Sequence, residues 1–183
     1  MNREDILDVI VDLYQEYEIS EFGFDLIKLI KKMEINLVLY SSFSKEKQVI
    51  LKNYDEDGFN VINPNNNKIE IYYNDIIKPK GRIYFTLPHE LGHICLGHNC
   101  RLENETEMQR CDANLFANEF YCPQAFMIHY NLKTVSDLVS AFDITEGYAK
   151  VLLEKLRKRR DRNLSYNEER LIKIFEYNKR KKS

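Results

Sequence analysis

Apolar side chains recur at helical spacing near both ends of the chain, which predicts amphipathic helices there. The segments with this pattern are residues 4–17, 24–33, 112–120, 134–142, 145–158 and 165–183. Thr134 and Thr145 precede two of these segments and are suited to cap them, and Asp137 completes a capping pattern with Thr134. The last segment is rich in lysine and arginine, and we expect it to fray into solvent.

Between these helical segments, β-branched and aromatic residues predict short strands. The segments are residues 35–42, 47–53, 57–63 and 68–74. The last two are joined by an asparagine-rich turn, which is typical of a hairpin. Ile69, Ile71 and Tyr73 alternate with Glu70 and Tyr72, as in a half-solvated strand. The pattern therefore predicts an α+β fold with N-terminal helices and a small antiparallel sheet.

Composition and charge add a division of the chain into two parts. The 183 residues are 44% hydrophobic and 31% charged, which is typical of a globular protein. From Lys155 onward there are 12 Lys and Arg against 4 Asp and Glu, whereas the whole chain has a net charge of −2. We expect a domain at residues 1–130 and a C-terminal helical appendage with a basic tail at residues 131–183.

The second part has helix-turn-helix spacing over residues 133–160, which raises the question of DNA binding. Glu146 stands in the first turn of the second helix, where base-reading helices present polar or basic side chains. The body of the chain is also acidic, which disfavours phosphate contacts. Direct DNA binding is therefore not expected.

Targeting signals are not evident in the sequence. No apolar run approaches the roughly 18 residues of a membrane span, and the N-terminus lacks a secretory pattern. The cysteines form no CxxC pair, so neither a disulfide framework nor a closed structural zinc site is expected. They are Cys95, Cys100, Cys111 and Cys122. These features favour a cytoplasmic protein that does not contact a membrane.

The strongest chemical motif is HExxH, at residues 89–93. On a helix, positions i and i+4 share one face, so His89 and His93 can bind one zinc ion. Glu90 can then face a water that the metal acidifies, and it can take the proton as that water attacks a carbonyl. Thr86 is placed to cap this helix, and Pro88 to lie in its first turn.

The longer metzincin pattern does not continue from this motif. It requires glycine and histidine at positions 96 and 99, where the chain has Leu96 and Asn99. His98 is one place off, and we expect it to be a polar residue at the helix exit. The third ligand is therefore sought in a following helix, as a carboxylate.

The residues around the motif resemble the ImmA/IrrE metallopeptidases. "GRIYFTLPHELGHICLGH", residues 81–98, and then "DANLFANEFYCP", residues 112–123, are similar to their signature. That signature is an F-T-x-A-H-E-x-G-H helix, then a helix close to E-x-x-A-N-x-F-A-x-x-L-L-x-P. The resemblance covers roughly residues 20–157, including the hairpin upstream and the helical region downstream. It implies a zincin-like fold with an HExxH active-site helix and a C-terminal helix-turn-helix-like region.

The resemblance also implies a function. Such proteins are zinc endopeptidases, often encoded on phages and other mobile elements. ImmA-type members cleave and inactivate a helix-turn-helix transcriptional repressor made alongside them, and IrrE-type members act in the same way in a stress response. His89 and His93 would be the zinc ligands, and Glu90 the general base. We expect the protein substrate to add as a strand along the edge formed by residues 68–75.

One position departs from the signature. The family's third ligand is a Glu four residues before the Asn of E-x-x-A-N, and that position holds Arg110, whose guanidinium cannot bind zinc. Glu107 is the preferred replacement, because it lies one turn earlier on the same helical face. Asp112 and Cys111 are alternatives, and His98, water or loss of the metal also stay open.

The departure keeps a second hypothesis alive, namely a catalytically impaired zincin-fold protein that acts as a protein-binding regulator. Asn114 lies on the metal-facing stripe and is placed to orient a ligand. The apolar residues that follow at helical spacing are expected to be core. They are Leu115, Phe116, Phe120 and Tyr121.

Overall fold

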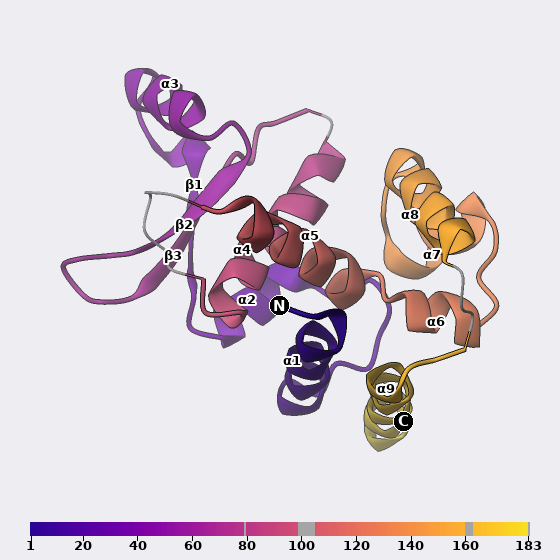
Figure 1. Cartoon of the computed structure of the whole chain (residues 1–183). Coiled ribbons are helices and arrows are strands. Elements are labelled where there is room, and N and C mark those ends of the chain that lie inside the picture. Colours follow the sequence, from indigo (N-terminus) through magenta and orange to yellow (C-terminus); the bar gives the residue numbers. More distant parts are fainter. Residues whose placement is uncertain (79, 99–104, 160–162, 183) are drawn as a thin grey trace. The chain divides into compact units, whose positions relative to one another are not determined.

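The structure is a computed structural model that describes residues 1–78, 80–98, 105–159 and 163–182, so Asn99 and Cys100 lie outside the described residues. The fold is α+β (Figure 1). The chain divides into two compact units, residues 25–114 and residues 1–24 with 115–183. These units do not follow the division at residues 130 and 131 that the sequence suggests. The reason is a long-range pairing of the first and last helices, which neither helix reveals by its own pattern.

Residues 25–114 contain a three-stranded sheet in the order β1-β3-β2. β2 (Gly58–Ile62) and β3 (Ile69–Tyr73) form an antiparallel pair, which confirms the predicted hairpin. β1 (Asn36–Leu39) runs parallel to β3 on its other side. The prediction of an antiparallel sheet is therefore wrong for β1. Strand direction depends on the path of the chain between the two strands, here through η1 (Tyr40–Ser42), α3 (Lys45–Tyr54) and β2. An apolar pattern carries no information on that path.

The segment predicted as a strand at residues 47–53 is instead helix α3 (Lys45–Tyr54). The Ser44 side chain caps it by accepting a hydrogen bond from the backbone N–H of Lys47. Gln48 and Leu51 are its buried residues, and their spacing of three is helical. Two adjacent apolar residues that suggested a strand, Val49 and Ile50, are exposed. A short apolar run fits either period, and the cap favours the helix.

β3 is the central strand, and it is more buried than the alternation of its residues predicts. Glu70 is buried and accepts hydrogen bonds from Asn63 Nδ2 at 2.9 Å, Tyr72 Oη at 3.0 Å and Asn36 Nδ2 at 3.3 Å. The hydrogen bond from Asn63 is the main reason why the pKa of Glu70 is lowered. The polar position of a half-solvated strand is therefore a satisfied buried carboxylate.

Helix α4 (Ile83–Cys95) packs on β2 and β3, and α2 (Leu26–Lys32) contacts both α4 and β1. α4 begins directly after the short helix η2 (Lys80–Arg82), about a turn earlier than expected. Thr86 therefore lies inside the helix, where its hydroxyl donates to the Arg82 carbonyl oxygen at 3.0 Å instead of capping. Pro88 lies inside the helix as well.

The second unit is helical. It contains α1 (Arg3–Glu16), α6 (Gln124–His129), α7 (Val135–Phe142), α8 (Glu146–Lys158) and α9 (Tyr166–Lys182), and α5 (Glu107–Tyr121) ends in it. Thr134 and Thr145 cap α7 and α8 as predicted, and Asp137 completes the capping box. Phe116, Phe120 and Tyr121 are buried, which confirms three of the predicted core residues, whereas Leu115 is only partly buried.

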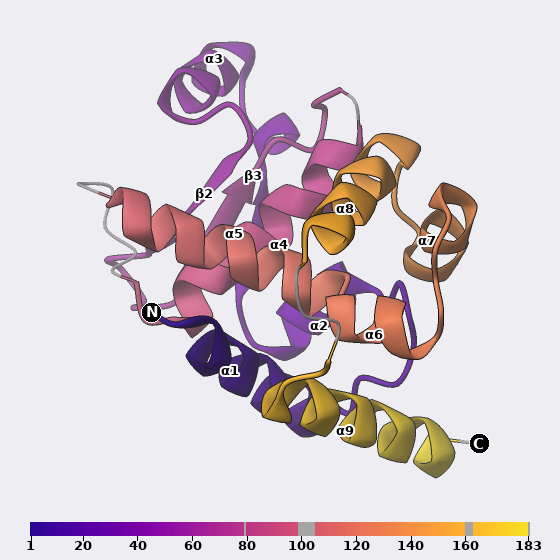
Figure 2. The same ribbon diagram turned by 45° about the vertical axis from the view of Figure 1, so that its right-hand side comes forward.

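α1 and α9 lie side by side (Figure 2). Asn178 on α9 is buried, and its amide donates to the carbonyl oxygens of Tyr14 at 2.9 Å and Ile19 at 3.1 Å. Lys182 Nζ donates to the Glu18 carbonyl oxygen at 3.0 Å. These contacts order the helix through Lys182, so the prediction of a frayed end is wrong. Within the described parts of the chain, no helix is both long and apolar enough to span a bilayer.

β2 packs closely against β3 and α4 at Gly58. A Cβ at this position would lie 2.7 Å from the Tyr72 carbonyl oxygen and 3.0 Å from Thr86 Cγ2 on α4. We expect Gly58→Ala to lower the free energy of unfolding by about 1–3 kcal/mol, because the sheet or α4 must shift. Urea unfolding measures this.

The matched control is Gly147→Ala on α8, where a Cβ meets nothing within 4 Å. An alanine in a helix should raise stability by roughly 0.5–1 kcal/mol. Equal effects of the two substitutions would contradict the close packing of β2 on α4.

Candidate metal centre

Helix α4 presents His89 and His93 on one face, because positions i and i+4 are one turn apart. Their Nε2 atoms lie 3.1 Å apart. Ligand atoms about 2.0–2.1 Å from one tetrahedral zinc ion are separated by about 3.3 Å. The two imidazoles are therefore spaced to share a metal ion, as the motif predicts.

A third ligand atom comes from Glu105, whose Oε1 lies 3.1 Å from His93 Nε2. The ligand atoms of His89, His93 and Glu105 all lie within 4.8 Å of one another, so this cluster could hold a metal ion. Two imidazoles and one carboxylate are a donor set that suits zinc and leaves a position open.

The structure does not bring the preferred sequence candidate, Glu107, into this cluster. Glu107 is exposed as the first residue of α5, whereas Glu105 lies two residues earlier, before the helix begins. Of the alternatives, Cys111 is exposed and Asp112 is buried. Asp112 acts on His98: burial lowers the pKa of this histidine, and the negative charge of Asp112 opposes that effect. The prediction assumed a carboxylate on the helical face, whereas the carboxylate near the two histidines belongs to Glu105, before the helix begins.

The backbone at Glu105 is fixed by a cap of α5. Gln109 N–H donates to Thr106 Oγ1 at 3.2 Å, and Thr106 N–H donates to Gln109 Oε1 at 3.0 Å. This reciprocal pair is a capping box, and it sets the direction in which the chain enters the helix. Arg110 then pairs with Glu105 through its guanidinium. The spacing Thr-x-x-Gln was the signal in the sequence that could have placed Glu105 at the helix entrance.

His98 is placed against His93 by the C-terminal end of α4. Gly97 has a left-handed φ of 67°, and the N–H of His98 returns to the His93 carbonyl oxygen at 2.9 Å. This turn brings the Nδ1 atoms of His98 and His93 within 3.0 Å. If His93 Nδ1 carries the proton, Nε2 stays free for a metal. His98 is therefore a neighbour of a candidate ligand, which the expectation of a polar residue at the helix exit did not capture.

Burial favours the neutral form of both histidines, which is the form that binds metals. Burial lowers the pKa of His89, although the charge of Glu105 and a hydrogen bond with Asn114 oppose that effect. Burial also lowers the pKa of His93, and the neighbouring His89 lowers it further. The contact of Asn114 with His89 agrees with the predicted role of Asn114 beside a ligand.

Glu90 lies next to this cluster and is 7% exposed. Its Oε2 accepts a hydrogen bond from Asn60 Nδ2 on β2 at 2.6 Å. Burial raises the pKa of Glu90 to about 8, against the effect of the Asn60 hydrogen bond. A cation at the neighbouring histidines would favour the ionised carboxylate. The side chain is thus fixed by the sheet and sensitive to charge at the cluster.

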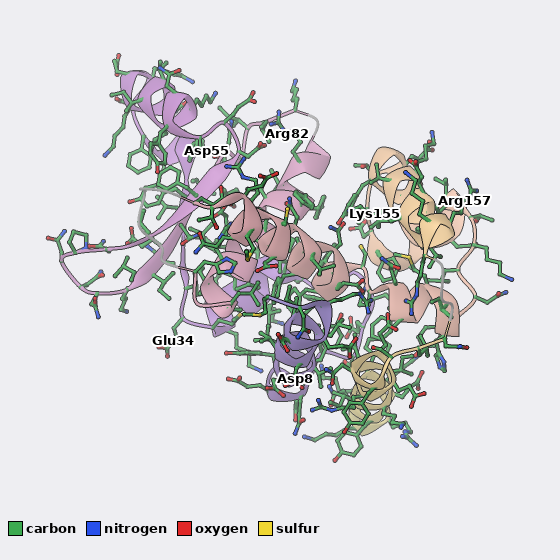
Figure 3. All side chains as sticks on the ribbon, viewed as in Figure 1. Asp8, Glu34, Asp55, Arg82, Lys155 and Arg157 are labelled. Atoms are coloured by element: carbon green, nitrogen blue, oxygen red, sulfur yellow. The ribbon has the colours of Figure 1, made fainter. Side chains whose placement is uncertain are left out.

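A cavity of about 630 Å³ opens over the histidines and Glu90. Its acidic side chains are Asp55, Asp57, Glu90 and Glu105, and Arg110 is its single Lys or Arg among the residues that the structure describes. Asp55 and Arg82, labelled in Figure 3, lie where β2 begins, and Arg82 Nη2 donates to Asp57 Oδ2 at 2.6 Å. The wall therefore favours a cation over an anion.

Comparison with protein-family models, with curated proteins and with solved structures found no match to this chain.

The raised pKa of Glu90 predicts a pH-dependent effect in metal-free protein. Between about pH 4.5 and 8 the folded chain keeps a proton on Glu90 that the unfolded chain has released, so this group lowers stability as the pH rises. Glu90→Gln removes that titration. We expect the free energy of unfolding of the variant, relative to that of wild type, to rise by roughly 1–3 kcal/mol as the pH is raised from 5 to 8.

Urea unfolding in the presence of a chelator measures the difference at both pH values. Glu107→Gln, at an exposed carboxylate of the same region, is the control and should show no such trend. A stability difference between wild type and Glu90→Gln that does not change with pH would contradict the buried carboxyl.

Proposed function

We propose that this protein is a zinc-dependent endopeptidase with a zincin-like fold. The observation that carries the proposal is that the ligand atoms of His89, His93 and Glu105 lie close together. These residues and the buried Glu90 line an open cavity. Arg110 had put the third ligand in doubt, and Glu105 offers the carboxylate that the signature position lacks. The arrangement supports hydrolysis more than a binding role, because a binding surface needs neither a metal ligand set nor a buried base.

The residues of the site have different roles in the proposed hydrolysis. His89, His93 and Glu105 would hold zinc, which supplies a Lewis acid that activates water and polarises a carbonyl when bound. Glu90 accepts the proton of the attacking water and delivers it to the leaving amine. Asn60 fixes the Glu90 carboxylate, because both its side-chain amide and its backbone N–H donate hydrogen bonds to it.

The substrate strand needs an open sheet edge, and the expected edge at residues 68–75 is not one. β3 is paired on both sides, so no further strand can add to it. β2 is an edge strand, and Gly58, Phe59 and Asn60 line the cavity. We therefore place an extended substrate along β2, where main-chain hydrogen bonds extend the sheet beside the metal ligands.

The target that the resemblance implies is a helix-turn-helix repressor of a phage or other mobile element, in the cytoplasm. An acid-rich cavity suits a substrate segment with basic side chains, which DNA-binding proteins carry in abundance. The second candidate is a catalytically impaired regulator that binds such a protein without cutting it, and the exposed Arg110 at the signature position favours that alternative.

The decisive test is cleavage of the helix-turn-helix regulator encoded beside the gene, followed by mass spectrometry. We expect wild-type protein with zinc to cut it, and a chelator to stop the reaction. Glu90→Gln should lower the cleavage rate by about 10²- to 10⁴-fold, because the general base is lost.

Glu107→Gln is the matched control and should cut as wild type does, since Glu107 is exposed at the start of α5. A stable complex with the regulator that shows no cleavage, and that forms equally with Glu90→Gln, would favour the regulator over the peptidase.

The substrate position on β2 has its own test at Ile62. Two hydrogen bonds show which residues of β2 point their N–H groups toward β3. The N–H of Asn63 donates to the Lys68 carbonyl oxygen, and the N–H of Asn74 donates to the Asp57 carbonyl oxygen. By the alternation of the ladder, the peptide N–H of Ile62 points away from β3. Ile62→Pro removes this donor while it leaves the β2–β3 bonds intact. We expect KM for the regulator to rise by roughly 5- to 10-fold, because one main-chain bond to the substrate is lost.

Ile62→Ala keeps this N–H donor. We therefore expect it to keep the wild-type KM, apart from the effect of any lost side-chain contact. If Ile62→Pro and Ile62→Ala had the same KM, substrate addition to β2 would be excluded.

A further inference from the structure

We propose that Arg110 is a positioning residue that holds Glu105 as the third metal ligand. This inference rests on the proposed metal site and deepens it. It assigns a role to the one residue that departs from the signature, on contacts that the described residues make.

The guanidinium of Arg110 contacts only one of the two carboxylate oxygens of Glu105. Arg110 Nε donates to Glu105 Oε2 at 2.9 Å, and Arg110 Nη2 donates to the same oxygen at 2.6 Å. The other oxygen, Oε1, is the one that faces His93 Nε2 at 3.1 Å. Two N–H groups thus engage one oxygen and direct the second to the histidines.

The position of Arg110 in the helix makes this hold possible. Thr106 and Gln109 form the capping box, so the backbone after Glu105 turns into α5 and brings residue 110 back toward Glu105. The cap fixes the main chain at Glu105, and Arg110 fixes its side chain. A glutamate before a helix would otherwise sample several rotamers, and each alternative would move the ligand oxygen away from the metal.

The ion pair of Arg110 with Glu105 contributes little to the stability of the fold. The Arg110 side chain is 64% exposed and that of Glu105 is 31% exposed. Ion pairs with this much exposure contribute little to stability, because water screens them. A carboxylate that binds a metal, by contrast, depends strongly on the hydrogen bonds that orient it. The contacts therefore fit a role in the site.

Arginine is also the cation that suits the task. Its planar fork can place two N–H groups on one side of a carboxylate, whereas lysine offers a point charge on a flexible stem. Lysine at this position should keep the charge next to Glu105 and lose most of the orientation. The two variants Arg110→Gln and Arg110→Lys separate these effects.

The experiment measures metal binding by the full chain, independently of cleavage. Zinc affinity is obtained by competition with a chromophoric chelator, and Co²⁺ replaces zinc as a visible spectroscopic probe. We expect Arg110→Gln to weaken zinc binding by about 10- to 100-fold, and Arg110→Lys to fall between this variant and wild type. The Co²⁺ band should change in position and intensity in Arg110→Gln, because the carboxylate is free to bind through both oxygens.

Arg170→Gln is the matched control. It removes an arginine that pairs with a carboxylate elsewhere in the chain, that of Asp8, and neither residue lines the cavity. Zinc affinity and the Co²⁺ spectrum should both stay as in wild type. Urea unfolding of the metal-free variants checks that Arg110→Gln and Arg170→Gln are folded.

A double variant tests whether Arg110 acts through Glu105. Glu105→Ala should weaken zinc binding more than Arg110→Gln does, and the addition of Arg110→Gln to Glu105→Ala should have no further effect. Wild-type affinity and spectrum in Arg110→Gln, or equal losses in both backgrounds, would overturn the positioning role alone. Failure of wild type to bind zinc, or unchanged binding in Glu105→Ala, would overturn the proposed metal site as well.

Discussion

The site depends on the placement of two imidazoles one helical turn apart on a helix that is held against a sheet. α4 packs on β2 and β3, and Gly58 allows the close approach of backbone to Thr86. The helix cannot rotate without moving these contacts, so the face that carries His89 and His93 is fixed. Glu90, one residue after the first histidine, is turned toward the sheet and meets Asn60 there.

The same arrangement places several charges in a small volume, and it would be unfavourable without a cation. Glu90 and Glu105 lie beside the imidazoles of His89 and His93, whose charged forms are disfavoured by burial, and Asp55 and Asp57 add to the acidic wall. The raised pKa of Glu90 expresses this burial and repulsion. A metal ion at the histidines would relieve both effects, since an opposite charge favours ionised carboxylates.

The carboxylate of the candidate metal cluster does not stand at the position that the signature gives its third ligand. The signature places a carboxylate on the helix, four residues before Asn114, and this chain has Arg110 there. The carboxylate comes instead from Glu105, before the cap of α5, and Arg110 contacts it from the signature position. In the site that we propose, Arg110 therefore stands where the signature has its ligand and orients the carboxylate of Glu105.

The sequence alone determined the features that are local. The HExxH spacing, the α5 segment, the hairpin of β2 and β3, and the caps at Thr134 and Thr145 each follow from residues close to one another along the chain. These features depend on backbone hydrogen bonds and side-chain spacing that the neighbouring residues fix. For the same reason, the pair of histidines and the adjacent Glu90 could be assigned from the order of the residues.

Only the tertiary structure decided what depends on distant partners. The parallel direction of β1, the order of α9 beside α1, and the burial of Glu70 all require contacts between segments far apart in the chain. The choice of Glu105 over Glu107 is also of this kind, because the direction of a side chain before a helix depends on what it meets across space. Hydrophobic pattern and motif spacing describe neighbours along the chain, and they carry no information about such meetings.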